Sequence, residues 1–144
     1  MTEDDKFYYF KKGDMDFLST YFHTSHFQCK CSNKECVDQK ISKELINKLE
    51  QLRGSCGWAI EITSGFRCEK QQAYIRKSGQ STVVAAHSSH EDGLAADIRA
   101  PSHNIHELNR FIEPLFDNIG TAINFTHVDV RPKKPDGTKR RWVY

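Results

Sequence analysis

Two histidines and an aspartate place the strongest demand on how this chain folds. His90 and Asp97 lie close together in the sequence, and His127 follows much later. Two neutral imidazole nitrogens and one carboxylate oxygen, with a fourth position left to water, form the ligand set of a catalytic zinc site. The residues between the first two ligands are small, namely Gly93, Ala95 and Ala96. Small residues let the backbone turn tightly, so we predict that the fold returns Asp97 to the metal that the histidines bind.

The residues around these ligands matter, because a chain with seven histidines and nineteen acidic residues also contains such triplets by chance. The pattern Ser-x-His-x-x-Gly-x-Ala-x-Asp is complete here, as Ser88, His90, Gly93, Ala95 and Asp97. It resembles the zinc-binding signature of the D-alanyl-D-alanine carboxypeptidase-like peptidases, a group that shares its fold with the hedgehog signalling domain.

The resemblance extends over nearly the whole chain. Residues 63–68 are similar to the strand end with the substrate-facing arginine, residues 125–131 to the strand with the third ligand, and residues 140–144 to the closing strand. Upstream, the resemblance reaches residues 21–31. The chain resembles most the short members found among phage endolysins and phage-borne cell-wall peptidases. The resemblance implies Zn2+ as the cofactor and peptidoglycan peptides as the substrate.

Arg67 is the arginine that the resemblance places toward the substrate. A guanidinium at the end of a strand binds a substrate carboxylate, or it stabilises the oxyanion that forms when water attacks. We therefore predict a catalytic role for Arg67. An ordinary surface arginine is the alternative interpretation.

The position of the general base departs from the family pattern. Peptide hydrolysis needs a base that takes a proton from water and passes it to the leaving amine. Many relatives have Glu or Asp three residues before the last ligand, or His two residues before it. This chain has Asn124 and Phe125 at those positions, and neither side chain can act as a base.

Asp129 is the replacement that strand geometry offers. Side chains at positions i and i+2 of a strand point to the same face, about 7 Å apart, so we expect Asp129 beside His127. We predict Asp129 as the general base. The alternative is a carboxylate that orients a metal ligand or pairs with Arg131, in which case His87 or Asp92 becomes the base.

The composition is that of a soluble globular protein. The chain of 144 residues is long enough for one domain, which we assign to residues 1–144. A charged fraction of 28% and an apolar fraction of 38% exclude a disordered chain. No apolar run approaches the ~18 residues that cross a bilayer, and the acidic start lacks a secretory signal. We therefore expect a monomer that is made in the cytoplasm, does not insert into membranes and acts on the bacterial cell wall.

Positive charge is concentrated near the end of the chain, although the net charge is only +2. Between positions 131 and 141 the basic residues outnumber the single acidic residue: Arg131, Lys133, Lys134, Lys139, Arg140 and Arg141 against Asp136. Such a stretch binds nucleic acid or the anionic polymers of a bacterial wall, or it forms a solvated hairpin tip. The turn residues Pro132, Pro135 and Gly137 favour the hairpin tip. We predict no nucleic-acid partner.

Five cysteines are present: Cys29, Cys31, Cys36, Cys56 and Cys68. An odd number in a chain without a signal peptide favours reduced thiols over a disulfide framework. Cys29, Cys31 and Cys36 also suggest a second, structural zinc, but their spacing lacks the usual C-x2-C and the fourth ligand is not evident. A second metal is therefore left open, and reduced thiols are favoured.

The pattern of apolar residues predicts a mixed fold. Helices are expected over residues 42–53, 69–77 and 103–116, a loop over 80–89, and strands over 58–63, 95–100, 119–125, 126–131 and 141–144. The aromatic run at residues 7–10 indicates an edge strand or a packed arm, and the apolar residues of 17–22 have helical spacing. Short connections join the strands, so we predict an α+β fold with a small antiparallel sheet flanked by helices.

These observations lead to a zinc metallopeptidase that hydrolyses peptide bonds of bacterial peptidoglycan, in the stem peptide or the crosslink, as a phage-type lytic enzyme. The substrate class is what the resemblance implies. One alternative is a catalytically silent zinc-binding domain with a binding or structural role, which the missing base keeps open. A further alternative is a zinc-dependent amidohydrolase that acts on another small peptide.

Overall fold

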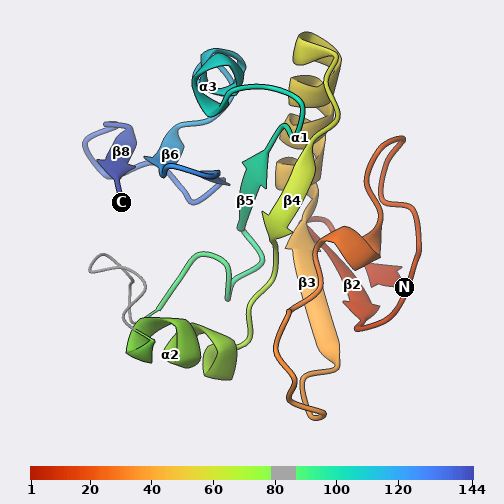
Figure 1. Ribbon diagram of the computed structural model, residues 1–144. Coiled ribbons are helices and arrows are strands. Elements are labelled where there is room, and N and C mark those ends of the chain that lie inside the picture. Colours follow the sequence, from red (N-terminus) through yellow and green to blue (C-terminus); the bar gives the residue numbers. More distant parts are fainter. Residues whose placement is uncertain (79–86) are drawn as a thin grey trace.

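The computed structural model describes residues 1–78 and 87–144, and over these residues the chain forms two sheets with three α-helices (Figure 1). Most of the loop expected over residues 80–89 lies outside the described residues. The helices and sheets are mixed along the chain, so the predicted α+β class is confirmed. In the described part of the chain, none of the helices has the length and apolar character needed to cross a membrane.

The first sheet is small and antiparallel. It consists of β1 (Thr2–Glu3), β2 (Phe7–Lys11) and β3 (Asp38–Ser42), with β2 in the middle. The aromatic run therefore forms a central strand, and the expected edge strand or arm was wrong. Phe10 is the member of this run that is buried in the core.

Residues 17–22 do not form the helix that their spacing indicated. The backbone N–H groups of Leu18 and Ser19 both donate to the carbonyl of Phe22, and Phe17 pairs with His23 in an isolated antiparallel bridge. A short 3-10 helix, η1 (Thr24–His26), follows. Phe22 is buried, whereas Phe17 and Tyr21 are exposed, so no apolar helix face is packed against the core here and the tertiary contacts favour the turn.

The predicted helix over residues 42–53 is confirmed as α1 (Lys43–Cys56). The hydroxyl of Ser42 caps it by accepting a hydrogen bond of 3.2 Å from the N–H of Leu45. At the other end, Gly57 adopts a left-handed conformation with φ of 74°, which is typical of a C-terminal glycine. The helix buries its apolar stripe completely: Leu45, Ile46, Leu49 and Leu52.

The second sheet has five strands and carries the candidate site. Its order is β4 (Glu61–Ser64), β5 (Ala95–Arg99), β7 (Thr126–Asp129), β6 (Asn118–Thr121) and β8 (Arg140–Val143). Neighbouring strands are antiparallel, except that β8 runs parallel to β6. Strands β5 and β7 lie next to each other inside the sheet, which explains why nearly all of their residues are buried.

The other two helices flank this sheet. Helix α2 (Glu69–Lys77) has the predicted bounds, whereas α3 (Ile105–Ile112) is shorter than the predicted 103–116. The side chain of Asn104 caps α3 by accepting from His106 N at 2.7 Å, and Pro114 stops it. Helix α3 packs against α1, while α2 lies apart from both (Figure 1). One apolar core joins α1 and α3 to both sheets.

Candidate metal centre

The strand register places two of the predicted ligands directly opposite each other. Asp97 on β5 pairs with His127 on β7, and Ser64 of β4 pairs with Asp97 on the other side. Residues directly opposite in an antiparallel pair have Cβ atoms about 5 Å apart on one face of the sheet. The side chains of Asp97 and His127 therefore meet, although their strands are separated by α3 and β6 in the sequence.

His90 reaches the same face from the turn that precedes β5. Gly93 has a φ of 71°, and a Cβ at this position would lie 2.8 Å from the carbonyl oxygen of Lys40. Glycine is therefore required both for the backbone conformation and for the close approach to β3. The hydroxyl of Ser88 accepts from the N–H of His90 at 3.2 Å and so supports this turn locally.

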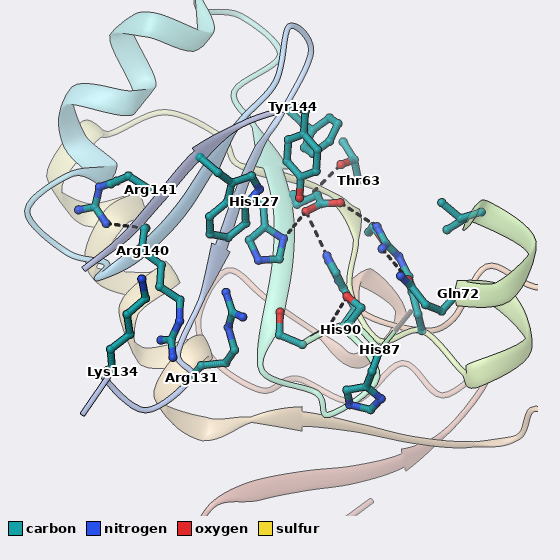
Figure 2. Close-up of a pocket in the computed structure, with 18 residues that line it drawn as sticks. Thr63, Gln72, His87, His90, His127, Arg131, Lys134, Arg140, Arg141 and Tyr144 are labelled. Carbon is teal, nitrogen blue, oxygen red and sulfur yellow. Dashed lines mark hydrogen bonds and ion pairs between the residues drawn. The ribbon is translucent and has the colours of Figure 1, made fainter. Parts of the chain in front are cut away.

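The two predicted histidine ligands converge on one carboxylate oxygen of the third ligand, Asp97. Oδ1 of Asp97 lies 3.1 Å from Nε2 of His90 and 3.0 Å from Nδ1 of His127. Figure 2 shows the two imidazole rings meeting there at the inner end of a cleft. N and O ligands of a tetrahedral zinc ion lie about 3.4 Å apart, since each bond is about 2.1 Å long. A small outward movement would therefore fit these donors to zinc, and the cluster can hold a metal ion.

Each of the two histidines has a second hydrogen-bond partner, and this partner fixes which ring nitrogen faces Asp97. Nδ1 of His90 lies 2.7 Å from the carbonyl oxygen of Gly65, and Nε2 of His127 lies 2.8 Å from Oδ2 of Asp129. Both oxygens only accept, so these nitrogens can keep their protons when a metal binds. A metal would then take the lone pairs of His90 Nε2 and His127 Nδ1, the nitrogens that face Oδ1 of Asp97 in this structure.

Burial and charge act in opposite directions on the three groups. Burial disfavours the ionised form of Asp97, but the neighbouring His90 and His127 outweigh it and hold the pKa of this carboxyl well below its usual value. Burial lowers the pKa of His90. Burial also opposes the charged form of His127, yet hydrogen bonds to Asp129 and Asp97 raise its pKa. A carboxylate and at least one neutral imidazole are therefore present at neutral pH.

Arg67 holds Asp97 from the other side. Its guanidinium donates from Nη2 to Oδ2 of Asp97 at 2.9 Å, from Nε to Ser64 at 3.0 Å and from Nη1 to Gln72 at 3.1 Å. Its side chain is only 15% exposed and lines the cleft. An ordinary surface arginine does not fit these contacts. The direct contact with a predicted ligand was not foreseen from the sequence.

Asp129 lies on the His127 face of β7, as the i, i+2 geometry predicted, but it is buried. Its Oδ2 faces His127 and also accepts from Ser89 at 3.4 Å. Its Oδ1 accepts from N and Nε of Arg131, at 3.1 and 3.0 Å. Burial raises the pKa of this carboxyl, but His127 and Arg131 more than compensate and hold it at about 2. The predicted role as general base is not tested by these contacts, which match those of a carboxylate that orients a ligand.

A cleft with a volume of about 660 Å³ opens over the cluster. One wall is basic and comes from the segment that was expected to be a solvated hairpin tip: Arg131, Lys134, Arg140 and Arg141 (Figure 2). Gln72 and Ile75 of α2 line the cleft from another side. His87 also lines the cleft, and its Nε2 lies 3.0 Å from Oδ2 of Asp92. Of the two alternative bases, His87 therefore faces the cleft.

The aromatic part of the cleft was not predicted from the sequence. The ring centroids of Trp142 and His127 are 5.1 Å apart, and Tyr144 lines the same cleft. Gly120 lies between Trp142 and His127 in the sheet register. A Cβ on Gly120 would lie 2.3 Å from the indole, so this glycine makes room for the ring. A glycine in a short strand could have been the signal for a close approach.

The comparisons with known proteins identify one family. A family model described as peptidase M15 matches residues 20–129, which include all three predicted ligands, Arg67 and Asp129. Neither the comparison with curated proteins nor that with solved structures gave a match.

Proposed function

Because the chain belongs to the peptidase M15 family, we propose that it is a zinc peptidase that hydrolyses peptide bonds of bacterial peptidoglycan. The observation that carries the proposal is the convergence of two imidazoles and one carboxylate at the inner end of a cleft that also holds a guanidinium. Three protein ligands leave one coordination position for water or substrate, as in catalytic rather than structural zinc sites.

In this proposal His90, Asp97 and His127 are the zinc ligands. The metal would supply Lewis-acid activation of water and of the scissile carbonyl. The protein would hold the two imidazoles in the required tautomers through Gly65 and Asp129. It would also keep Asp97 ionised, since His90 and His127 hold the pKa of this carboxyl low and Arg67 pairs with it.

Arg67 would bind the substrate carbonyl or a substrate carboxylate while it holds Asp97. Its position beside a ligand and its exposure to the cleft support both tasks. Asp129 was predicted as the base, but its burial and its four contacts support the alternative, that it orients His127. His87 is then the imidazole that carries the proton between water and the leaving amine, with Asp92 as its partner.

The charge of the cleft supports an anionic peptide as substrate. The stem peptides of peptidoglycan carry free carboxylates, and the basic wall of Arg131, Lys134, Arg140 and Arg141 faces the same space as the ligands. Charged clefts with low-dielectric walls raise the local concentration of an oppositely charged substrate. The resemblance to short phage enzymes supports a lytic role on the cell wall, in stem peptide or crosslink.

Digestion of purified peptidoglycan tests the proposal. We expect the protein to release soluble peptides, to lose this activity with a chelator and to regain it with added zinc. Mass spectrometry of the products identifies the bond and distinguishes a carboxypeptidase from an endopeptidase. The matched control is His106→Ala, because His106 is exposed and away from the cleft.

A catalytically silent zinc-binding domain is the second candidate, favoured by one observation. The positions of the usual base hold Asn124 and Phe125, and Phe125 lines the cleft. Such a domain would bind peptidoglycan fragments and zinc without product formation. Cleavage of another small peptide, but not of peptidoglycan, would instead indicate the amidohydrolase alternative.

A further inference from the structure

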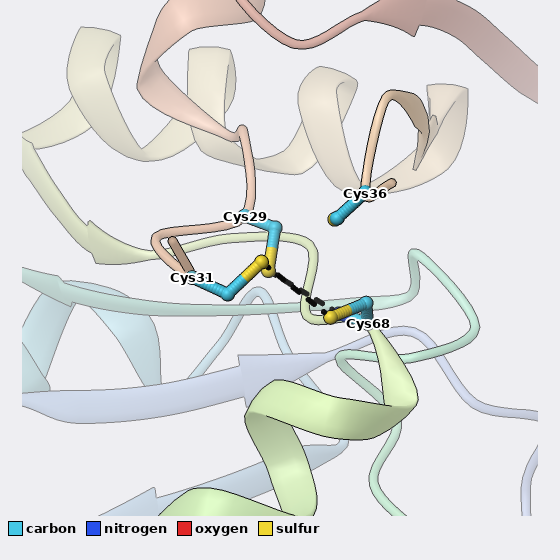
Figure 3. Close-up of side chains that lie close together, drawn as sticks. All are labelled: Cys29, Cys31, Cys36 and Cys68. Carbon is cyan, nitrogen blue, oxygen red and sulfur yellow. Dashed lines mark hydrogen bonds between the residues drawn. The ribbon is translucent and has the colours of Figure 1, made fainter. Parts of the chain in front are cut away.

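Four of the five cysteines lie together at the start of α2 and form a group separate from the His90, Asp97 and His127 cluster in the sheet. Figure 3 shows three of them, Cys29, Cys31 and Cys36, approaching from the segment before β3, and Cys68 approaching from the N-cap of α2. Their sulfur atoms all lie within 4.8 Å of one another. The fifth cysteine, Cys56, is at the end of α1 and contacts Trp58 instead.

The distances between the sulfurs match a shared metal ion. Zn–S bonds of about 2.3 Å in a tetrahedral site place the sulfurs about 3.8 Å apart. Sγ of Cys31 and Sγ of Cys68 are 3.7 Å apart. A disulfide needs sulfurs about 2.05 Å apart, and all five cysteines are free thiols in the structure.

Each of the four sulfurs also accepts a hydrogen bond from nitrogen. Backbone N–H groups donate to two of them, from Cys68 to the sulfur of Cys29 and from Gln71 to that of Cys68, both at 3.4 Å. Side chains donate to the other two, Lys12 to Cys31 and Gln39 to Cys36, again at 3.4 Å. Donors directed at every sulfur stabilise negative charge there, as thiolate ligands require.

The surroundings also compensate for the charge that four thiolates would bring. Lys12 contacts Cys31 directly, and Lys30 and Lys70 line the hollow beside it. Cys68 occupies the N-cap of α2, where the helix dipole favours an anion. This fourth ligand is distant in sequence, which is why the spacing of the first three cysteines did not indicate a complete site.

We propose that Cys29, Cys31, Cys36 and Cys68 form a structural site for one tetrahedrally coordinated zinc ion. Four sulfur ligands leave no open position, so the site stabilises the fold and takes no part in hydrolysis. Its location gives it a specific task. It ties the segment before β3 to the start of α2, next to Arg67, and thereby fixes the strand end from which Arg67 reaches Asp97.

Metal content tests this site separately from the site in the cleft. Protein purified with a thiol reductant and no added metal should contain about two zinc ions per chain by elemental analysis and native mass spectrometry. His90→Ala, Cys31→Ser and Cys36→Ser should each contain about one, and the matched control Cys56→Ser should contain about two. Replacement of zinc by cobalt should give a thiolate-to-cobalt charge-transfer band in the wild type and in His90→Ala, but not in Cys31→Ser.

If the cysteine variants fail to fold, His90→Ala still tests the site, because this variant retains all four cysteines. A folded His90→Ala protein that binds no zinc and gives no charge-transfer band with cobalt would overturn it. Iron in place of zinc, a second zinc that survives both cysteine substitutions, or disulfides in the reduced protein would overturn it as well. The zinc retained by His90→Ala and the cobalt band report the cysteine site alone, so they would be unchanged if the cleft bound no zinc or hydrolysed no peptide.

Discussion

The cluster of His90, Asp97 and His127 and the cluster of four cysteines differ in how the chain builds them. Adjacent strands of the five-stranded sheet supply Asp97 and His127, and the donors face a cleft. Loop residues and the start of a helix supply the cysteines, and each sulfur accepts a hydrogen bond from an N–H group. Rigid strands suit a centre whose geometry must be held for chemistry, whereas loops suit a metal that replaces missing packing.

The number of ligands adds to this contrast. Three protein ligands with mixed nitrogen and oxygen donors leave room for a reactant, while four thiolates complete a tetrahedron. We therefore expect substitutions in the first cluster to remove activity at constant stability, and substitutions in the second to lower stability first. Arg67 lies between the two, because it contacts Asp97 and precedes Cys68 in the chain.

The largest loss of activity is expected when the proposed zinc ligands in the cleft are replaced. His90→Ala and His127→Ala should each lose the cleft zinc and at least ~10³-fold in activity, since Lewis-acid stabilisation is worth several kcal/mol. Circular dichroism should show a folded protein, and elemental analysis should show that the zinc of the cysteine cluster is retained. Full zinc content and activity in both variants would contradict the ligand assignment.

Replacement of Arg67, which lies between the two clusters, tests whether this residue takes part in hydrolysis. At saturating zinc, Arg67→Ala should lower turnover by about 10²-fold, as loss of one oxyanion donor does. Arg67→Lys should recover only part of it, because an ammonium group cannot bind Ser64, Gln72 and Asp97 at once. Arg76→Ala, on the exposed side of α2, is the control. Unchanged turnover in Arg67→Ala would make this residue a structural partner of Asp97 only.

The Asp129→Asn variant distinguishes the two roles considered for Asp129, namely orienting His127 and acting as the general base. If it orients His127, Asp129→Asn should weaken zinc binding about 10–100-fold, with turnover restored when zinc is saturating. Gln39→Ala should likewise weaken only the cysteine cluster, since Gln39 contacts Cys36 and Cys29 N. Normal zinc affinity combined with a persistent loss of about 10²–10⁴-fold in turnover would instead make Asp129 the general base.

Local patterns in the sequence predicted most elements of the fold. The apolar pattern of residues 42–53 predicted α1, which Ser42 caps and which buries its leucines. The local turn around Gly93 was also predictable, because a small-residue segment must bring His90 and Asp97 together. These features depend on neighbours in the sequence, which is why single-sequence reasoning reached them.

The contacts that were missed all join distant parts of the chain. Cys68 completes the cysteine cluster from beyond α1 and β4, and Trp142 reaches His127 across Gly120. The basic segment was expected to be a solvated tip, yet it forms a wall of the cleft because β8 pairs with β6 in parallel. Such contacts depend on strand order and register, which no local pattern encodes.

The smallest expected effect is a difference in how pH changes the two zinc affinities. In the cleft, hydrogen bonds to Asp129 and Asp97 outweigh burial and raise the pKa of His127 above its ordinary value of 6.5. Protonated His127 has no lone pair for a metal, so the apparent affinity of the cleft should fall about tenfold per pH unit below this raised pKa and level off above it. In the cysteine cluster, burial raises the pKa of Cys36 to about 12. Metal binding there must displace that proton even in mildly alkaline solution, so its affinity should still rise where the cleft has levelled off.

Competition with a chelator over a series of pH values measures both affinities, with Cys36→Ser isolating the cleft and His90→Ala the cysteine cluster. Asp129→Asn sharpens the comparison further. It removes a carboxylate that raises the pKa of His127, so the acid limb of the cleft should move to lower pH even though the affinity itself is weaker. The cysteine cluster should not respond to this substitution. An acid limb that stays in place would show that His127 does not control the loss of zinc, and a pH-independent cleft would mean that no imidazole binds the metal there.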